Sequence, residues 1–289
     1  MKNIDKPIDP RTDYIKEACT NSKLKSYPKL LKFSLRAERI EKYYDSCSGS
    51  PNIIFESKNS KEEKDELVYL YDNPPNCLSY IGEQRNSEAG ETCPMCGGYF
   101  PTTLDHFLPK KKYSDYALLP YNLVPACDCN QKRGDRTIDH CTGARVLHPF
   151  YDSVLSIPLI RLEFDPSARP PRFKIQYLLH TSNPHYINLD FHVKNVLLRT
   201  SFLEFAAKKW SKIRDTPRRT LPLFDDYCSN NKQFNEYLIN LYNTAAEDDG
   251  VNSWKAILYR SVAEQRISDW LFLNYKRTAI LRILNNRAK

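Results

Sequence analysis

Apolar residues recur every three or four positions through the first part of the chain. In residues 28–46, Leu30, Phe33, Ala37, Ile40 and Tyr44 fall near one face of a helix, which is the spacing of an amphipathic helix. A second, short helix is expected in 62–72, because prolines at 74 and 75 disfavour its continuation. We therefore expect residues 1–90 to form a mainly helical N-terminal region.

The pattern changes again after residue 153. The segments SIPLIRLEF and RFKIQYLL suit two strands joined by a proline-rich turn. Longer amphipathic patterns follow in 190–215, 232–246 and 252–284 and predict helices. Residues 154–289 are thus expected to form two strands and a helical C-terminal region. Part of its apolar face is expected to be exposed for a partner, around Trp254, Leu258, Trp270 and Phe272.

Residues 91–153 lie between these regions and are rich in Cys, Pro and Gly. Four of the nine cysteines fall here, as a CxxC pair and a CxC pair: Cys93, Cys96, Cys127 and Cys129. Two such knuckles can meet one tetrahedral Zn²⁺, and metal binding stabilises a small segment that has little apolar core. The single residue inside the second pair restricts ligand geometry, which leaves Cys141 and His140 as alternative ligands.

Composition narrows the class of protein. The formal charge is +8 and hydrophobic residues make up 41% of the 289 residues, so a sizeable core and a polyanionic partner such as nucleic acid are both compatible. No apolar run approaches the length of a membrane span, and the first residues lack a secretion signal. A cytoplasmic location without membrane association is therefore expected, with reduced cysteines.

The segment TLDHFLPKKKYSDYALLPYNLVPACDCNQKRGD, at 103–135, carries more polar chemistry than a packed core needs. Asp105 and Asn130 offer the oxygen ligands that Mg²⁺ or Mn²⁺ prefers. His106 can act as a general base near neutral pH. On a strand, adjacent side chains point to opposite faces. The pair Asp105 and His106 could therefore face apart, or a turn could bring both to one cleft.

These motifs, in this order, resemble the HNH nucleases of the His-Me finger group in their zinc-knuckle form, over residues 93–135. The resemblance implies an α+β fold: a ββα-metal finger, stabilised by a Cys₄ zinc site and embedded between mainly helical N- and C-terminal regions. It also implies that His106 is the general base, that Asp105 and Asn130 bind the catalytic divalent metal, and that Asn122 steadies the hairpin. The family usually has CxxC before the last Asn, where this chain has Cys127-Asp128-Cys129.

The resemblance predicts a metal-dependent endonuclease that hydrolyses phosphodiester bonds of nucleic acid, with DNA favoured. Four basic residues are candidates for contact with the nucleic-acid backbone: Lys110, Lys111, Lys132 and Arg133. The layout is also similar to the HNH subunits of Septu-type and retron-associated antiphage systems, which implies an ATPase partner. The alternative is a zinc ribbon without catalysis that binds nucleic acid or regulates another protein.

Overall fold

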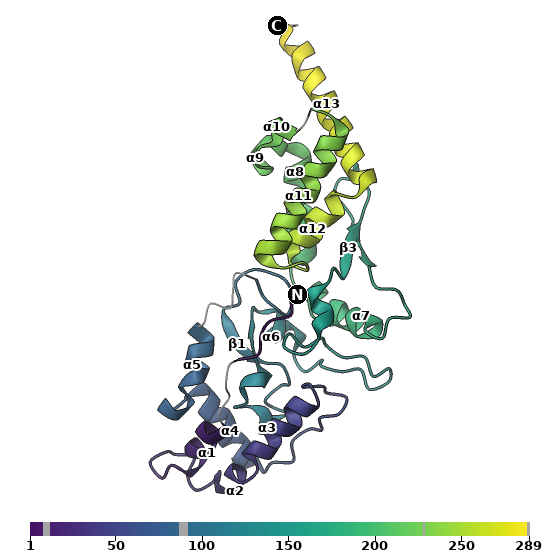
Figure 1. Cartoon of the computed structure of the whole chain (residues 1–289). Helices are drawn as coiled ribbons and strands as arrows, with labels where there is room; N and C mark the ends of the chain where they lie inside the picture. The colour runs from purple at the N-terminus through teal and green to yellow at the C-terminus, as the bar shows by residue number, and fades with distance from the viewer. Residues whose placement is uncertain (8–11, 87–91, 228, 288–289) are drawn as a thin grey trace. The chain divides into compact units, whose positions relative to one another are not determined.

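The computed structural model describes residues 1–7, 12–86, 92–227 and 229–287 (Figure 1). It divides into two compact units: unit 1 is 1–156 with 181–200, and unit 2 is 157–180 with 201–289. The expected N-terminal region and the expected nuclease module both fall in unit 1. The boundary expected at residue 90 lies outside the described residues, and the three-part division stays a prediction.

Unit 1 combines short helices with one small antiparallel sheet. Its α-helices are α1 (Thr12–Thr20), α2 (Leu31–Ser34), α3 (Ala37–Ser46), α4 (Lys61–Asp72), α5 (Ser79–Asn86), α6 (Cys129–Arg133) and α7 (Tyr186–Asn195). Its strands are β1 (Thr103–His106) and β2 (Leu123–Ala126). Its 3₁₀ helices are η1 (Asn76–Leu78), η2 (Ser114–Tyr116), η3 (Pro120–Asn122), η4 (Ser153–Ser156) and η5 (Leu197–Arg199).

The helical pattern of 28–46 is divided between α2 and α3. Leu35 and Arg36 separate them, and Leu35 is 88% exposed. Helix α4 begins at a capping box in which Ser60 and Glu63 bond each other's backbone amides. It ends before the two prolines, as predicted.

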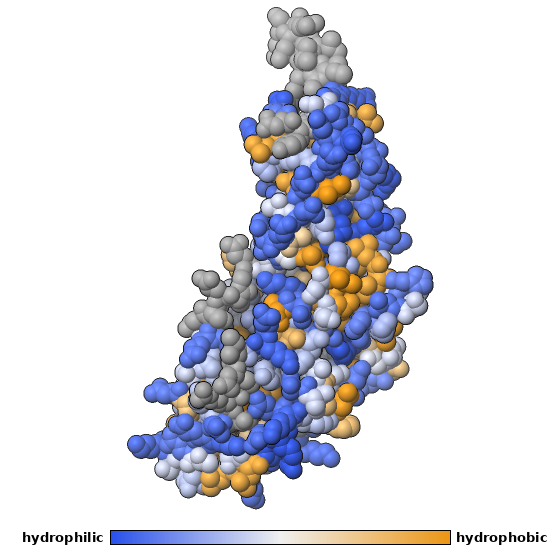
Figure 2. All heavy atoms as spheres, viewed as in Figure 1, coloured by the Kyte–Doolittle hydropathy of each residue, from blue (hydrophilic) through white to orange (hydrophobic). Residues whose placement is uncertain are grey.

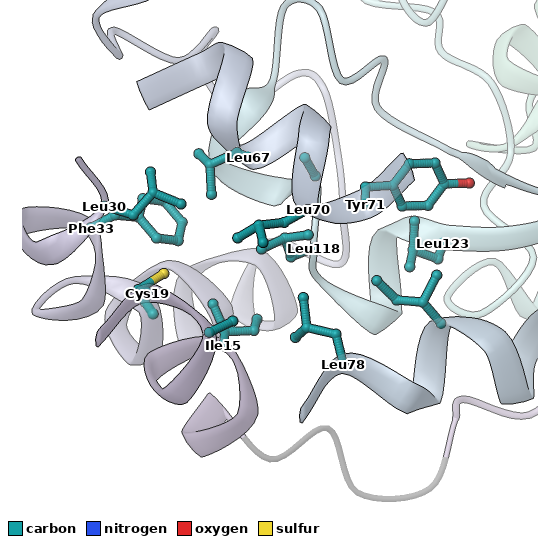
Figure 3. Packing of buried hydrophobic residues seen from close by; sticks show 14 of the residues in the cluster. Ile15, Cys19, Leu30, Phe33, Leu67, Leu70, Tyr71, Leu78, Leu118 and Leu123 are labelled. Atoms are coloured by element: carbon teal, nitrogen blue, oxygen red, sulfur yellow. The ribbon is translucent and has the colours of Figure 1, made fainter. Parts of the chain in front are cut away.

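One hydrophobic cluster joins these helices to the sheet (Figure 3). Helix α4 contributes Leu67 and Leu70, β1 contributes Leu104, and β2 contributes Leu123. Helix α1 adds Ile15 and Cys19, α2 adds Phe33, and the loop between the strands adds Leu118. The N-terminal helices therefore supply the apolar support that the short hairpin lacks.

Unit 2 is a helical bundle with the second sheet. Strands β3 (Ile160–Glu163) and β4 (Lys174–Tyr177) pair antiparallel, as the sequence predicted. The helices are α8 (Phe202–Asp215), α9 (Pro217–Thr220), α10 (Phe224–Tyr227), α11 (Asn231–Asp249), α12 (Trp254–Val262) and α13 (Gln265–Arg287). Trp210 is buried among aromatic neighbours, with its ring centroid 4.8 Å from that of Phe164.

The prediction that the C-terminal helices expose an apolar face around Leu258 is wrong for Leu258 itself. Leu258 is fully buried in α12, and Trp254, Trp270 and Phe272 are partly buried. Leu258 faces inward because α12 packs against α11, α8 and β3. No helix within the described ranges is long and apolar enough to cross a membrane.

Candidate metal centre and active site

The first cysteine pair forms a knuckle that follows from its sequence. The amide of Gly97 donates to the carbonyl of Cys93 at 2.8 Å, and the amide of Cys93 donates to the carbonyl of Gly98 at 2.7 Å. Gly97 has a φ of 75°, a conformation that residues with a side chain rarely adopt. The amide of Gly98 then points at Cys96 Sγ, 3.3 Å away. The turn therefore holds both thiols on its inner side.

The second pair completes a cluster of four thiols. Cys127 follows β2 and Cys129 begins α6, so the change from strand to helix turns both sulfurs inward. The Sγ atoms of Cys93 and Cys129 are 3.7 Å apart, and those of Cys96 and Cys127 are 3.4 Å apart. All four lie within 4.8 Å of one another. A tetrahedral Zn²⁺ with Zn–S bonds of about 2.3 Å requires sulfurs about 3.8 Å apart.

These four cysteines could therefore hold a metal ion, and zinc suits a set of thiolates. Hydrogen bonds from the neighbouring thiols, with Cys127 first, hold the pKa of the Cys93 thiol well below its ordinary value. His140 and Cys141 are both exposed and lie outside the cluster. Both cysteines of the CxC pair, Cys127 and Cys129, therefore lie in the cluster, and neither His140 nor Cys141 replaces them.

His106 ends β1 with its imidazole buried and oriented. Its Nε2 atom lies 2.9 Å from the carbonyl oxygen of Ala117. A carbonyl can only accept, so Nε2 carries the proton in the neutral ring and Nδ1 is left as the basic atom. Burial lowers the pKa of His106 to about 4, so the ring is neutral at pH 7. The ring of Tyr71, on α4, meets it edge-on with centroids 4.3 Å apart.

Asp105 and His106 are neighbours in β1 whose side chains differ in exposure but approach each other at their polar ends. Their Oδ1 and Nδ1 atoms are 4.0 Å apart, although the residues are neighbours in β1. The carboxylate also accepts a 2.7 Å hydrogen bond from the amide of His106. Its side chain is 36% exposed, whereas that of His106 is 3% exposed. A hydrated ligand could therefore reach the carboxylate from solvent.

Asn130 lies in the first turn of α6, directly after the cysteine Cys129. Its Nδ2 donates to the backbone carbonyl of His106 at 3.1 Å, which places the amide beside the end of β1. Its Oδ1 is buried and has no hydrogen-bond partner among the described residues. Buried polar atoms are nearly always partnered, so this oxygen suits a ligand such as a hard cation.

Asn122 is fully buried and uses its whole hydrogen-bonding capacity. Its Oδ1 accepts from the amide of Leu108 at 2.7 Å and from the hydroxyl of Tyr44 at 3.0 Å. Its Nδ2 donates to the carbonyls of Leu108 at 3.1 Å and Tyr116 at 3.0 Å. These bonds tie together the two ends of the loop that joins β1 to β2, and that loop carries Ala117, the partner of His106.

The four basic candidates lie in different surroundings. Lys110 forms an ion pair with Asp72 at 2.7 Å, and Lys132 forms one with Asp128 at 2.7 Å. Lys111 is exposed. Arg133 is only 1% exposed, and its guanidinium donates to the backbone carbonyls of His106 and Phe107 at 3.2 and 2.8 Å. It therefore supports the end of β1 from inside and is not presented to a polyanion.

Two side chains behind the site were not predicted to act there. His148 is fully buried, with its ring centroid 3.9 Å from that of Phe107. Its Nδ1 accepts from the amide of Phe150 at 3.2 Å, so its Nε2 carries the proton and donates to Tyr44, 3.2 Å away. Tyr44 in turn donates to Asn122. The sequence pattern placed Tyr44 on the apolar face of a helix, which indicates burial and does not reveal a hydrogen bond.

Comparison with known proteins does not show a family for this chain. The chain matches no protein-family model and no solved structure. Over 66 residues, which are 22% of this chain, it is 38% identical to protein ea31 of Escherichia phage lambda. The match spans 22% of that protein's length as well. This likeness covers too little of either chain to show a family.

Proposed function

We propose that this protein is a metal-dependent endonuclease with an HNH-type ββα finger, formed by β1, β2 and α6. The observation that carries the proposal is the orientation of His106. Its Nε2 atom is held by a carbonyl, which leaves Nδ1 as the base, 4.0 Å from Asp105. The unpartnered Oδ1 of Asn130 is a second support, because it adds an oxygen donor near the same strand end.

In this proposal each residue has one task. Asp105 and Asn130 would hold Mg²⁺ or Mn²⁺, which when bound neutralises the phosphate and stabilises the leaving oxygen. His106 accepts a proton at Nδ1 from the attacking water, while Ala117 keeps Nε2 protonated. In-line attack then leaves a 5′-phosphate. Asn122 keeps the loop in place, and the four cysteines would hold a structural zinc that ties the start of α6 to the first cysteine knuckle.

A plasmid-nicking assay tests this proposal. Wild-type protein should nick in Mn²⁺ and not in EDTA, and His106→Ala should lower the rate by about 10²–10⁴-fold, the usual loss for a general base. His140→Ala is the matched control, because this histidine is exposed. Zinc content and circular dichroism should be unchanged in both variants. A wild-type rate in His106→Ala would reject the assignment.

The second candidate is a zinc-ribbon module that binds nucleic acid or regulates a partner without cleaving. The burial of His106 favours it, because a 3% exposed imidazole behind Tyr71 resembles a core residue. This module would bind nucleic acid equally well with or without added Mn²⁺ and would never nick it.

We also propose that the nuclease acts in the cytoplasm, as the effector of a bacterial antiphage system that includes an ATPase partner. The resemblance to defence-associated HNH subunits supports this role. Co-expression with an ATPase encoded beside its gene, followed by size-exclusion chromatography, tests the partnership. Separate elution of two folded proteins would count against it.

A further inference from the structure

The positive charge of this protein is concentrated in one unit. Unit 2 contains 19 lysines and arginines against 12 aspartates and glutamates, a formal charge of +7. Unit 1 contains 24 against 23, a formal charge of +1. The unit that carries the proposed active site is thus almost neutral. A charge asymmetry of this kind points to a polyanion as the partner of the basic unit.

Helix α8 and the adjoining α9 present basic side chains to solvent. Helix α8 buries Phe202, Ala206, Trp210 and Ile213 at helical spacing. The remaining surface carries Lys208 and Lys212, which are exposed and one turn apart, and Arg219 in α9 is exposed as well. Lys209 is partly buried beside them. We call these four residues the α8 cationic face: Lys208, Lys209, Lys212 and Arg219.

The acidic residues nearby do not neutralise this face. Asp215 pairs with Arg214 and Arg169, and Asp225 pairs with Arg218, each at 2.9 Å. Within the described ranges, no carboxylate forms an ion pair with any member of the α8 cationic face. Burial and the charges of Lys212 and Lys255 lower the pKa of Lys209, so its neighbours repel it. An arriving anion would relieve this repulsion.

The proposed active site itself offers few free basic side chains to a nucleic-acid backbone. Of the four basic residues expected to contact the backbone there, Lys110 and Lys132 already have carboxylate partners and Arg133 is buried, which leaves Lys111. Affinity for nucleic acid comes largely from lysines and arginines that displace counterions from phosphates. Figure 2 shows hydrophilic residues over most of the visible surface of unit 2, with hydrophobic residues scattered among them.

We infer that the α8 cationic face binds the phosphate backbone of nucleic acid, independent of sequence, and supplies affinity that the proposed active site lacks. The inference rests on the proposed function for its biological meaning. Binding itself can be measured without catalysis. An acidic protein surface is the other polyanion that would fit, and the single-sign charge without aromatic anchors favours a repeating backbone.

The test is fluorescence anisotropy with a labelled DNA duplex of arbitrary sequence, without added divalent metal, over a series of KCl concentrations. The variant combines Lys208→Gln, Lys212→Gln and Arg219→Gln. The control removes three exposed lysines of unit 1 that have no carboxylate partner among the described residues: Lys23→Gln, Lys32→Gln and Lys58→Gln. In the α8 variant the slope of log K against log [KCl] should become shallower by about 2 to 3, since each lost phosphate contact contributes about 0.9.

The control should keep the wild-type slope, and Glu204→Gln, which removes an exposed acid of α8, should tighten binding. An unchanged slope in the α8 variant overturns the inference. Equal losses in both triple variants would also overturn it, because net charge alone would then explain them. Weakened binding of poly-glutamate with unchanged binding of DNA would instead assign the face to an acidic protein.

The two proposals fail separately. If the α8 variant binds with the expected shallower slope but wild type does not nick plasmid in Mn²⁺, the nuclease proposal falls and the α8 cationic face stands. If wild type nicks in Mn²⁺ and the α8 variant binds with the wild-type slope, the face falls and the nuclease proposal stands.

Discussion

The hydroxyl of Tyr44, on α3, donates a 3.0 Å hydrogen bond to Oδ1 of Asn122, at the end of η3. The two residues are 78 positions apart, and both are fully buried. His148 donates to the same hydroxyl from the other side. A residue of the N-terminal helices thus helps to hold the loop that orients His106.

Tyr44→Phe removes this hydroxyl and changes little else. It should lower the free energy of unfolding by about 1–3 kcal/mol, because it leaves polar atoms of Asn122 and His148 short of a buried partner. Tyr43→Phe is the control, since Tyr43 is 38% exposed and its hydroxyl donates to the carbonyl of Ile53. Urea unfolding measures both, and an equal loss would mean that the buried relay adds no stability.

Gly49 packs directly against the same pair of side chains. A Cβ atom there would lie 2.8 Å from His148 Cδ2 and 2.8 Å from the Tyr44 hydroxyl, and φ is +62°. Gly143→Ala separates the two effects, because Gly143 has a φ of +72° with nothing within 4 Å of a Cβ. Backbone strain alone should cost about 1–2 kcal/mol in Gly143→Ala. Gly49→Ala should cost clearly more in urea unfolding, and equal costs would contradict the close contact.

Single cysteine substitutions should distinguish a cysteine that binds zinc from an exposed cysteine that does not. Cys93→Ser should lose bound zinc and destabilise unit 1, because metal binding in such a module contributes to folding. Cys141→Ser should keep one zinc per chain, since Cys141 is exposed and outside the cluster. Elemental analysis and thermal unfolding measure both. Unchanged zinc in Cys93→Ser would refute the four-cysteine site.

Leu258 and Leu273 test the interior of unit 2. Leu258 is fully buried and Leu273 is 67% exposed. Leu258→Ala should therefore lower the free energy of unfolding by about 2–5 kcal/mol through lost burial and a cavity. Leu273→Ala should change it by about 0.5 kcal/mol or less. Chemical denaturation followed by tryptophan fluorescence measures both values. An equally small loss of unfolding free energy in Leu258→Ala would contradict the burial of Leu258.

Much of the local structure followed from sequence pattern, because the forces that set it act between near neighbours. The prolines at 74 and 75 marked the end of α4. Alternating apolar residues and a proline-rich turn indicated β3 and β4. The helical pattern of 252–284 did not reveal the break at Ala263 and Glu264 between α12 and α13. It also misplaced Leu258, because amphipathicity shows that a face is apolar and not what covers it.

The sequence by itself determined the donor chemistry of this protein: four thiols in two knuckles, and a histidine between potential oxygen ligands. Their identities and short spacings are properties of the chain alone. The tertiary structure decided how these groups are presented. It set the basic nitrogen of His106 through Ala117, left Oδ1 of Asn130 without a partner among the described residues, and buried Arg133. These outcomes depend on contacts between distant segments, where burial and competition for hydrogen bonds choose the partner.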